Sequence, residues 1–407
     1  MGEVIIIGGG VGGLTLALAL HRVGIPAQIF EAAAEWRPLG VGINILPQAS
    51  AILCRELGLE DALTAKAVLT REAAFFNRFG QLIYTEPLGR AGGNAFPQFS
   101  IHRADLHQAL ADAAVARLGA ERIHLGWRCT GVSENTSEAI ASFSDARTNE
   151  TLPAQAAAVV IGCDGLHSVV RKQLHPAEGE PLYSGVNMFR GVTVWPRILS
   201  GATMIRAGWF TPGKMVIYPI RDLPDGRQLV NWLAEVAMSE HKARDWNRRG
   251  DVADFVHIFE NWRFDWLDVP AFIRAAELIL EFPMIDQEPL PFWTTRRVTL
   301  LGDAAHPMYP RGSNGAGQAI LDASALARSL ASDADWPTAL SGYESARLPT
   351  TANVVRMSRA NPPDAILREV YERTGDRPFE RLEDVITRDE MMNLLDTYRR
   401  VTSGQPT

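Results

Sequence analysis

The N-terminal glycine loop is the feature that most restricts how this chain can fold. The apolar run Val4-Ile5-Ile6-Ile7 is followed by glycines at positions 8, 10 and 13 and by a helical pattern to about residue 23. A GxGxxG spacing between a β-branched strand and a helix is typical of a βαβ unit that binds a dinucleotide. The loop has both its strand and its helix, so it predicts such a unit at the N-terminus.

Each glycine has its own task in a loop of this kind. Gly8 permits the tight turn, Gly10 lets the backbone approach a pyrophosphate, and Gly13 lets the helix pack closely on the strand. The first amides of the helix then face the phosphates. Glu31, at the end of the next apolar run, is placed to accept hydrogen bonds from an adenosine ribose. FAD and NAD share this half, and a glycine loop kept for packing alone is the alternative.

Composition excludes several other kinds of partner. The 407 residues carry a formal net charge of -7 and no dense basic run, so we expect no nucleic-acid partner. The three cysteines lie far apart, which favours a reducing compartment and argues against a disulfide framework or a metal site. No apolar stretch approaches the length of a membrane span. We therefore expect a cytoplasmic protein that binds neither metal nor membrane.

Patterns further along the chain predict an α/β fold that an antiparallel sheet interrupts. Residues 156–161 and 297–301 have the pattern of buried strands, and residues 47–57 and 314–330 that of helices. Strand-like runs separated by turn residues predict a mainly antiparallel sheet at 188–195, 203–209, 214–220 and 228–236. The expected division is a discontinuous Rossmann-like domain of 1–75, 100–180 and 285–360, a substrate domain of 76–99 and 181–284, and a C-terminal helical segment of 361–407.

Tryptophan is concentrated in and beside the inserted region. Either these side chains line a cavity for a flat ligand, or they pack in an ordinary core, which is the commoner role of a single tryptophan. The sequence leaves both interpretations open for the seven residues concerned, which are Trp195, Trp209, Trp232, Trp246, Trp262, Trp266 and Trp293.

Two further motifs lie far from the glycine loop. Asp164 follows a predicted strand and begins an Asp-Gly turn, and Asp303 follows another strand in a Gly-Asp pair that leads through a proline- and glycine-rich loop into a helix. Taken alone, Asp303 is equally well explained as a helix cap. Taken together and in this order, the three motifs resemble the FAD-dependent aromatic hydroxylases, also called class A flavoprotein monooxygenases. The resemblance covers roughly residues 1 to 360.

The resemblance implies an FAD-binding domain of the GR2 type and the residues that surround the cofactor. In that family the aspartate of the Gly-Asp pair contacts the ribityl side of the flavin. The N-terminus of the next helix points at the ring system, where reduced flavin carries negative charge. The implied cofactor-binding residues are Gly8, Gly10, Val11, Gly13, Glu31, Ala32, Val41, Arg103, Trp127, Cys129, Asp164, Asp303, Asn314 and Gly315.

The resemblance also implies the reaction. NADH or NADPH reduces FAD, reduced flavin and O2 form a C4a-hydroperoxide, and its distal oxygen passes to a small aromatic or heteroaromatic ring, expected to be a carboxylate or a phenol. The hydroperoxide has to be kept dry. The stretches at 37–45, 191–193, 245–247 and 318–322 resemble in particular the family members that act on phenazine carboxylates, which favours hydroxylation with decarboxylation.

The loop after the Gly-Asp pair holds the candidates for substrate binding, Pro310, Arg311 and Gly312. The guanidinium of Arg311 is suited to bind a carboxylate with two hydrogen bonds. A solvated loop arginine is the alternative. Arg190 and Arg206, on predicted strands of the inserted sheet, are weaker candidates for the same role.

Two tyrosines are the candidates for catalysis, because the flavin itself carries the oxygen chemistry. Tyr309 in the loop and Tyr218 on a predicted strand are placed to orient or deprotonate a substrate hydroxyl. Packing with a satisfied hydroxyl group is the alternative for either.

Two other functions remain compatible with the sequence. An FAD-dependent dehydrogenase or reductase would use the same fold without oxygenation, and a non-catalytic dinucleotide-sensing protein would bind the cofactor without turnover. The protein is expected to be a monomer or a homodimer, and the segment from residue 361 either covers the substrate domain or forms a dimer contact.

Overall fold

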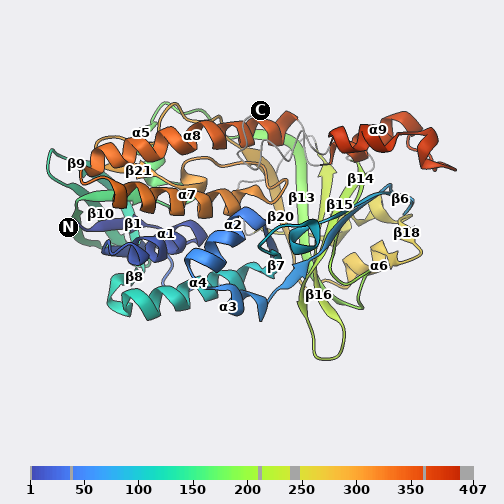
Figure 1. The fold of residues 1–407 in the computed structure, drawn as a ribbon, viewed down its shortest axis with the longest axis horizontal. Coiled ribbons are helices and arrows are strands. Elements are labelled where there is room, and N and C mark those ends of the chain that lie inside the picture. Colours follow the sequence, from blue (N-terminus) through green and yellow to red (C-terminus); the bar gives the residue numbers. More distant parts are fainter. Residues whose placement is uncertain (1, 37–39, 210–212, 239–247, 361–363, 395–407) are drawn as a thin grey trace.

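The computed structural model describes residues 2–36, 40–209, 213–238, 248–360 and 364–394. They form two lobes side by side, each built around its own sheet (Figure 1). We call them the parallel lobe and the antiparallel lobe. Within these ranges, no helix is both long and apolar enough to cross a membrane.

The parallel lobe contains a five-stranded sheet that gathers strands from distant parts of the chain. Its strands are all parallel and run in the order β21 (Val298–Leu300), β12 (Val159–Gly162), β1 (Val4–Ile7), β2 (Ala27–Glu31) and β8 (Ile123–Leu125). Every residue of β1, β12 and β21 is buried, as expected for parallel strands that are covered on both faces. The sheet confirms the expected α/β fold.

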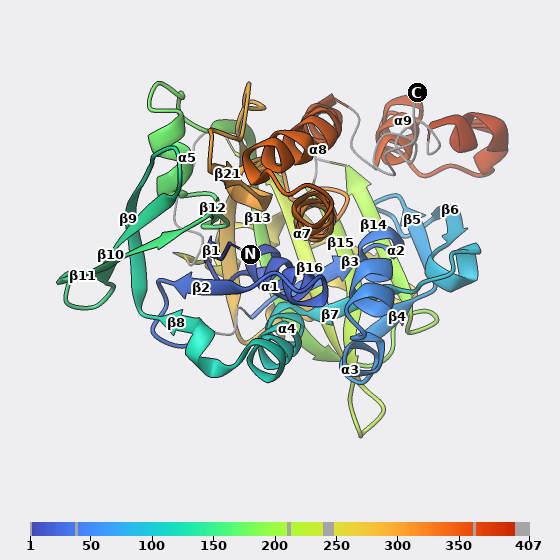
Figure 2. The same ribbon diagram turned by 60° about the vertical axis from the view of Figure 1, so that its left-hand side comes forward.

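Helices cover one face of this sheet and a small antiparallel sheet covers the other. The helix α1 (Val11–Arg22) packs between α4 (Arg103–Leu118) and α7 (Asn314–Ser332), and α8 (Trp336–Ala360) packs on α7 (Figure 2). The small sheet contains β9 (Trp127–Glu134), β10 (Ala139–Asp145) and β11 (Thr151–Ala157), and the short helix α5 (Val169–Leu174) lies against β9.

The single strand predicted at 156–161 is wrong, because two strands meet there. Ala156 and Ala157 end β11 and pair with β10, whereas β12 begins at Val159 and pairs with β1. The predicted helix at 47–57 is also divided. It is α-helical in α2 (Pro47–Ala51) and continues as a π-helix over Ile52–Glu56, where the amide of Leu57 donates to the carbonyl of Ile52.

The antiparallel lobe is an eight-stranded sheet, antiparallel except for the parallel contact between β14 and β5. This confirms the predicted mainly antiparallel sheet, which also takes in the early hairpin of β5 and β6. The strand order is β17 (Arg248–Arg249), β20 (Ile279–Asp286), β13 (Leu182–Trp195), β16 (Gln228–Ala237), β15 (Gly213–Asp222), β14 (Thr203–Trp209), β5 (Glu72–Phe76) and β6 (Leu82–Pro87).

Aromatic side chains fill the outer face of this sheet under α6 (Val269–Arg274) and the short strands β18 (Arg263–Phe264) and β19 (Leu267–Asp268). Trp232 and Trp262 are fully buried there, with Trp195 and Trp266 packed against them. A tryptophan-lined ligand cavity is therefore wrong for these side chains, which build a core. Trp246 lies outside the described residues.

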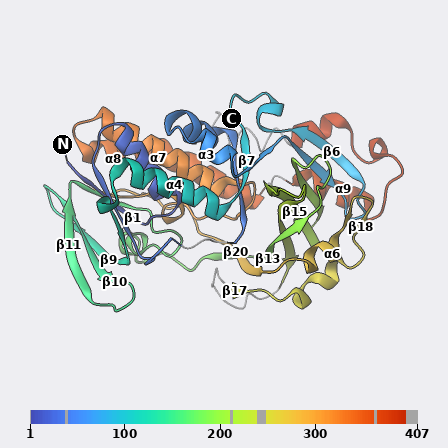
Figure 3. The same ribbon diagram turned by 90° about the horizontal axis from the view of Figure 1, so that it is seen from below.

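A second small sheet joins the lobes, and the C-terminal helix covers the antiparallel lobe. The joining sheet contains β3 (Gly42–Ile45), β7 (Gln98–His102) and β4 (Val68–Thr70), with α3 (Glu60–Thr64) beside β7. The helix α9 (Ala365–Thr374) packs on β14, at the end of the molecule opposite to β9 and β10 (Figure 3). Of the two roles expected for the C-terminal segment, covering the substrate domain is the one that this packing supports.

Candidate active site

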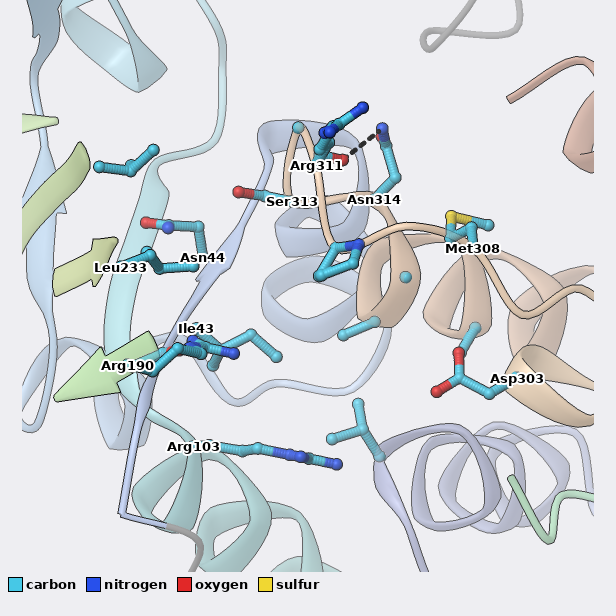
Figure 4. Close-up of a pocket in the computed structure, with 18 of the residues that line it drawn as sticks. Ile43, Asn44, Arg103, Arg190, Leu233, Asp303, Met308, Arg311, Ser313 and Asn314 are labelled. Atoms are coloured by element: carbon cyan, nitrogen blue, oxygen red, sulfur yellow. Dashed lines mark hydrogen bonds between the residues drawn. The ribbon is translucent and has the colours of Figure 1, made fainter. Parts of the chain in front are cut away.

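A cavity of about 300 Å³ lies where the two lobes meet (Figure 4). The parallel lobe contributes the N-termini of α1, α4 and α7 and the loop after β21. The antiparallel lobe contributes side chains from β13, β14, β15 and β16, and the joining sheet contributes β3. Cavities of this size at a domain interface are the usual place for a cofactor and a small substrate.

The glycine loop has the geometry that its spacing predicts. Gly8 has φ +104°, a conformation that favours glycine. A Cβ on Gly13 would lie 2.0 Å from the carbonyl oxygen of Gly8, so only glycine allows the helix to pack this closely on the loop. A Cβ on Gly10 would meet nothing within 4 Å, and no side chain caps α1 at this residue. The first turn of α1 therefore opens on the cavity with exposed amides.

The N-terminus of α7 opens on the same cavity. Ser313 precedes the helix in the left-handed region, with φ 60° and ψ 30°, and its side chain caps no amide. Asn314 and Gly315 line the cavity, and the side-chain amide of Asn314 donates to the carbonyl of Arg311 at 3.5 Å. Two uncapped helix N-termini thus supply free amides and positive potential to one space, as an anionic group requires.

Arg103 and Asp303 reach into the cavity from opposite sides (Figure 4). The backbone amide of Arg103 donates to the carbonyl of Val41 at 2.9 Å, which fixes the start of α4 beside the joining sheet. Arg103 is exposed to the open cavity, but desolvation by the surrounding protein still lowers its pKa, and the opposing charge of Asp303 partly offsets this effect. One positive and one negative side chain therefore face each other across the cavity.

A buried carboxylate holds the Gly-Asp loop in place. Asp322 on α7 is fully buried, accepts a hydrogen bond from the amide of Gly302 at 3.2 Å and lies 2.6 Å from Nε2 of His306. Its other oxygen accepts from Nε of Arg347 at 2.7 Å. Burial raises the pKa of Asp322, but His306 and Arg347 more than offset this and hold it below its usual value. His306 therefore supports the loop from behind and does not line the cavity.

Side chains on one face of the antiparallel sheet form the other wall of the cavity. On β15 these are Lys214, Val216 and Tyr218, at alternate positions of one strand. Val216 is paired with Arg206 of β14 and with Leu233 of β16. The wall is thus polar at the Tyr218 end, apolar in the middle and charged at the Lys214 end.

Comparison with known proteins identifies the family. The family described as FAD binding domain matches residues 1–233 and 286–358. Phenazine 1,6-dicarboxylic acid hydroxylase PhzS of Lysobacter antibioticus is 42% identical over 365 residues, covering 88% of this chain and 89% of that protein. The chain belongs to this FAD-binding family. The 3-amino-4-hydroxybenzoate 2-monooxygenase PtmB3 of Streptomyces platensis is 35% identical and covers 94% of each chain.

Solved structures agree on the fold. A crystal structure of CtdE in complex with FAD and a substrate superposes with a TM-score of 0.78 at 21% identity, covering 99% of both chains. A single-substitution variant of Klebsiella pneumoniae HpxO complexed with FAD gives a TM-score of 0.74 at 21% identity, covering 100% of this chain and 95% of that one. The chain is an FAD-dependent aromatic monooxygenase, as the three motifs predict, and the expected fold class and cofactor are confirmed.

The residues of this monooxygenase fit the cofactor. The exposed amides at the N-termini of α1 and α7 and the open space at Gly10 suit a diphosphate and an electron-rich ring system. Of the predicted cofactor-binding residues, the structure brings six together around the cavity: Gly10, Val11, Arg103, Asp303, Asn314 and Gly315. Gly8 and Gly13 shape the loop behind them.

Glu31 and Asp164 already have partners within the protein. The two carboxylate oxygens of Glu31 accept from the amides of Gly9 and Ala33, each at 2.7 Å, with Ala32 between. Asp164 accepts from the hydroxyl of Ser168 at 2.6 Å and from amides at the start of α5. Burial raises the pKa of Asp164, and the hydrogen bond from Ser168 opposes this. Ribose binding by Glu31 and a cofactor contact by Asp164 stay predictions.

Three other predicted cofactor residues are buried or half-buried and do not line the cavity. Trp127 packs with Phe30 and Phe143, the thiol of Cys129 is buried and its pKa is raised to about 12 by that burial, and Val41 belongs to a hydrophobic cluster. Their proposed contacts through the backbone stay predictions.

The two candidate tyrosines lie in different environments. Tyr218 lines the cavity, and burial raises its pKa, an effect that the nearby Arg190 opposes. Tyr218 is therefore a hydrogen-bond donor at neutral pH. Tyr309 packs in a small cluster with Val186 and Met284 and does not line the cavity. Packing is the role that the structure supports for Tyr309.

Arg190 is fixed at the polar end of the wall. Its Nη2 donates to the carbonyl of Gly42 at 2.6 Å, and the amide of Gly42 donates to the side chain of Asn231 at 2.6 Å. These contacts tie β13 and β16 to the joining sheet. Arg190 and Arg206 both line the cavity, and carboxylate binding by either of them stays a prediction.

Sequence reasoning missed three charged residues of the cavity. Lys214, Glu235 and Asp364 all line it and are almost fully buried, at 1%, 3% and 1% exposure. The one signal in the sequence is a lysine at the start of an alternating strand, which ordinarily indicates a solvent-exposed face. The loop candidates Pro310, Arg311 and Gly312 line the cavity as predicted.

Proposed function

We propose that this monooxygenase hydroxylates a flat aromatic or heteroaromatic carboxylate with O2 and with NADH or NADPH as reductant. Bound FAD supplies the reduction of O2 and the transfer of one oxygen atom to the ring. The chain binds and orients the ring, balances its charge and excludes water.

The charge of the cavity wall is the observation that carries this proposal. The described residues that line the cavity include five basic side chains, Arg103, Arg190, Arg206, Lys214 and Arg311, against three acidic ones, Glu235, Asp303 and Asp364. Arg103 and Asp303 are exposed, and the remaining four basic and two acidic side chains are buried or half-buried. This excess of positive charge away from water favours an anionic ligand, because it costs free energy until an opposite charge balances it. Arg311 is only 7% exposed, so the solvated-loop alternative does not describe it.

The length of the wall supports a fused-ring substrate. Tyr218 and Lys214 are four residues apart on one face of β15, which is about 13 Å along a strand. A single benzene ring with one carboxyl group does not reach between these ends, whereas a two- or three-ring system does. The apolar middle formed by Val216 and Leu233 suits the ring faces. Phenazine 1,6-dicarboxylic acid, the substrate named for the 42% identical hydroxylase, is a compound of this shape.

Tyr218 and the loop would divide two tasks. The phenol of Tyr218, kept protonated by burial, donates a hydrogen bond to a substrate oxygen or ring nitrogen at the polar end. Pro310 lacks an amide hydrogen and Gly312 has φ 69°, so the loop turns tightly over the cavity with few groups that bind water. Exclusion of water at this point favours oxygen transfer over release of hydrogen peroxide.

The test is a substrate screen on the purified FAD enzyme. Oxidation of NADH and of NADPH is followed with one-, two- and three-ring aromatic acids, and products formed under 18O2 are analysed for one labelled oxygen and for CO2. The expected result is stimulation by fused-ring carboxylates with 18O in the product. Stimulated NAD(P)H oxidation with no labelled product from any acid would favour the reductase without oxygenation. Release of CO2 in step with hydroxylation would assign decarboxylation.

A further inference from the structure

Lys214 lies between two carboxylates at the charged end of the cavity. Its Nζ is 2.7 Å from Oε1 of Glu235 and 2.5 Å from Oδ2 of Asp364. All three side chains are at most 5% exposed. A lysine is almost never fully buried unless it is paired, so both acids are needed to keep this ammonium group inside the protein.

Two arginines extend this arrangement into one chain of charges. Nη1 of Arg206 is 2.5 Å from Oδ1 of Asp364, and Nε of Arg311 is 3.7 Å from Oε2 of Glu235. We call Arg206, Asp364, Lys214, Glu235 and Arg311 the charge network. It contains three cations and two carboxylates, and all five residues line the cavity.

The two carboxylates come from parts of the chain outside the family match. That match covers residues 1–233 and 286–358, whereas Glu235 and Asp364 lie beyond its two segments. Both cations that contact Asp364, by contrast, lie within the first segment. Glu235 and Asp364 therefore reach the cavity from outside the two matched segments.

Asp364 is held firmly in the cavity wall. It directly precedes α9, whose residues Ile366, Leu367 and Val370 are buried in the hydrophobic cluster of the antiparallel lobe. Burial raises the pKa of Asp364, but Lys214 and then Arg206 more than offset this, so its carboxyl is ionised. The C-terminal segment thus contributes a charged group to the cavity.

Building on the proposed function, we propose that the charge network selects substrates with a single carboxylate at this end, and that Asp364 is a positioning residue that holds Lys214 and Arg206 toward it. One substrate carboxylate balances three cations and two carboxylates. A second, adjacent carboxylate would face Glu235 and Asp364 at short range, where like charges are weakly screened. Removing either acid therefore favours a ligand with two adjacent carboxylates.

The experiment compares two ligands on the FAD-loaded full chain. Naphthalene-2-carboxylate and naphthalene-2,3-dicarboxylate differ by one adjacent carboxylate, and their Kd values are measured from the change in flavin absorbance. In the wild type we expect the monocarboxylate to bind at least tenfold more tightly. Asp364→Asn and Glu235→Gln should each shift the ratio of the two Kd values at least tenfold toward the dicarboxylate.

Asp376→Asn is the matched control, because it makes the same change on the same segment away from the cavity. Asp376 accepts from Nε of Arg78 at 2.8 Å on the surface of the antiparallel lobe. This variant should keep the wild-type ratio. A merely structural role for Asp364 would change both Kd values together and leave their ratio unchanged.

Two results would overturn the proposal. One is an unchanged ratio in Glu235→Gln and in a folded Asp364→Asn; if Asp364→Asn does not fold, Glu235→Gln decides alone. The other is a wild type that binds the dicarboxylate more tightly. The proposed function is tested separately, and it fails if no aromatic acid stimulates NAD(P)H oxidation in the wild type. If carboxylates are turned over but the ratio of the two Kd values is unchanged in the variants, only the proposed selectivity of the charge network is refuted.

Discussion

Replacing Arg311 by methionine tests whether the cavity binds a carboxylate through this side chain. Arg311 lines the cavity, is 7% exposed and lies 3.7 Å from Glu235. Methionine keeps an unbranched, largely apolar stem and removes the guanidinium group with its charge and its five N–H donors. The expected result is weaker binding of carboxylated substrates, with uncharged analogues affected little.

The magnitude follows from the burial of the site. Two opposite charges about 4 Å apart interact by about 4 kcal/mol at an effective dielectric constant of about 20. Desolvation of both groups reduces this, and hydrogen bonds to charged groups contribute about 1.5–3 kcal/mol net. A loss of this size corresponds to a Kd roughly 10- to 150-fold higher. At the surface the same pair would contribute about 0–1 kcal/mol.

The assay uses one aromatic carboxylate and its carboxamide, which has nearly the same shape and no charge. Both are titrated into the FAD enzyme, and Kd and kcat/KM are measured for wild type and Arg311→Met. Arg328→Met is the control, since Arg328 is an arginine of α7 with a side chain 59% exposed. It should change neither ligand's Kd.

An equal rise in Kd for the carboxylate and the carboxamide would refute this prediction. It would mean that Arg311 shapes the loop and does not interact with the charge of the ligand. Arg311→Lys separates the remaining possibilities. It keeps the charge but loses the fork of donors, so partial recovery of carboxylate binding indicates a charge contribution. No recovery indicates that the two-bond geometry is required.

Three further substitutions test the framework around the cavity. Asp303→Ala should lower FAD retention after gel filtration and increase the hydrogen peroxide formed per NAD(P)H; full FAD content with full hydroxylation would contradict the assignment. Asp322→Asn removes the charge of a fully buried carboxylate paired with the nearly buried Arg347 and should lower the free energy of unfolding by about 3–5 kcal/mol, against at most about 1 kcal/mol for the half-exposed Asp222→Asn. Because the folded-state pKa of Asp322 is lowered, its contribution is present above the unfolded pKa near 4 and is lost as the pH falls through the folded value, so this difference should shrink in acid. Gly13→Ala places a Cβ 2.0 Å from a backbone oxygen and should cost at least about 1–3 kcal/mol in urea unfolding; an unchanged midpoint would show that the loop relaxes freely.

The cofactor half of the site could be predicted because its information is local. The turn at Gly8, the close packing at Gly13 and the open space at Gly10 are all consequences of one strand–turn–helix segment. The N-terminus of α7 likewise follows directly from the loop before it. In such segments neighbouring residues determine the backbone, so spacing alone indicates which amides are exposed.

Carboxylates that already accept hydrogen bonds from nearby parts of the chain are harder to assign to a ligand from the sequence. Glu31 and Asp164 stand at the predicted strand ends, yet their carboxylates bond to amides within a few residues of chain or to the glycine loop. The same side chains that suit a ligand also suit a turn or a helix start. A sequence pattern gives the position of such an acid, but it leaves open whether the carboxylate accepts hydrogen bonds from a ligand or from the protein backbone.

The substrate half of the site depends on long-range pairing, which local sequence does not encode. Lys214 and Val216 alternate with Met215 and Ile217, and this period of two predicts only that the faces differ. For an ordinary antiparallel sheet, the face with the lysine would be the solvated one. Here the parallel lobe and Asp364, which comes 150 positions later in the chain, close over that face, so that the polar face becomes the wall of a cavity. The strand that looks half-exposed in sequence therefore lines the cavity, and it is the one to which we assign substrate specificity as a proposal.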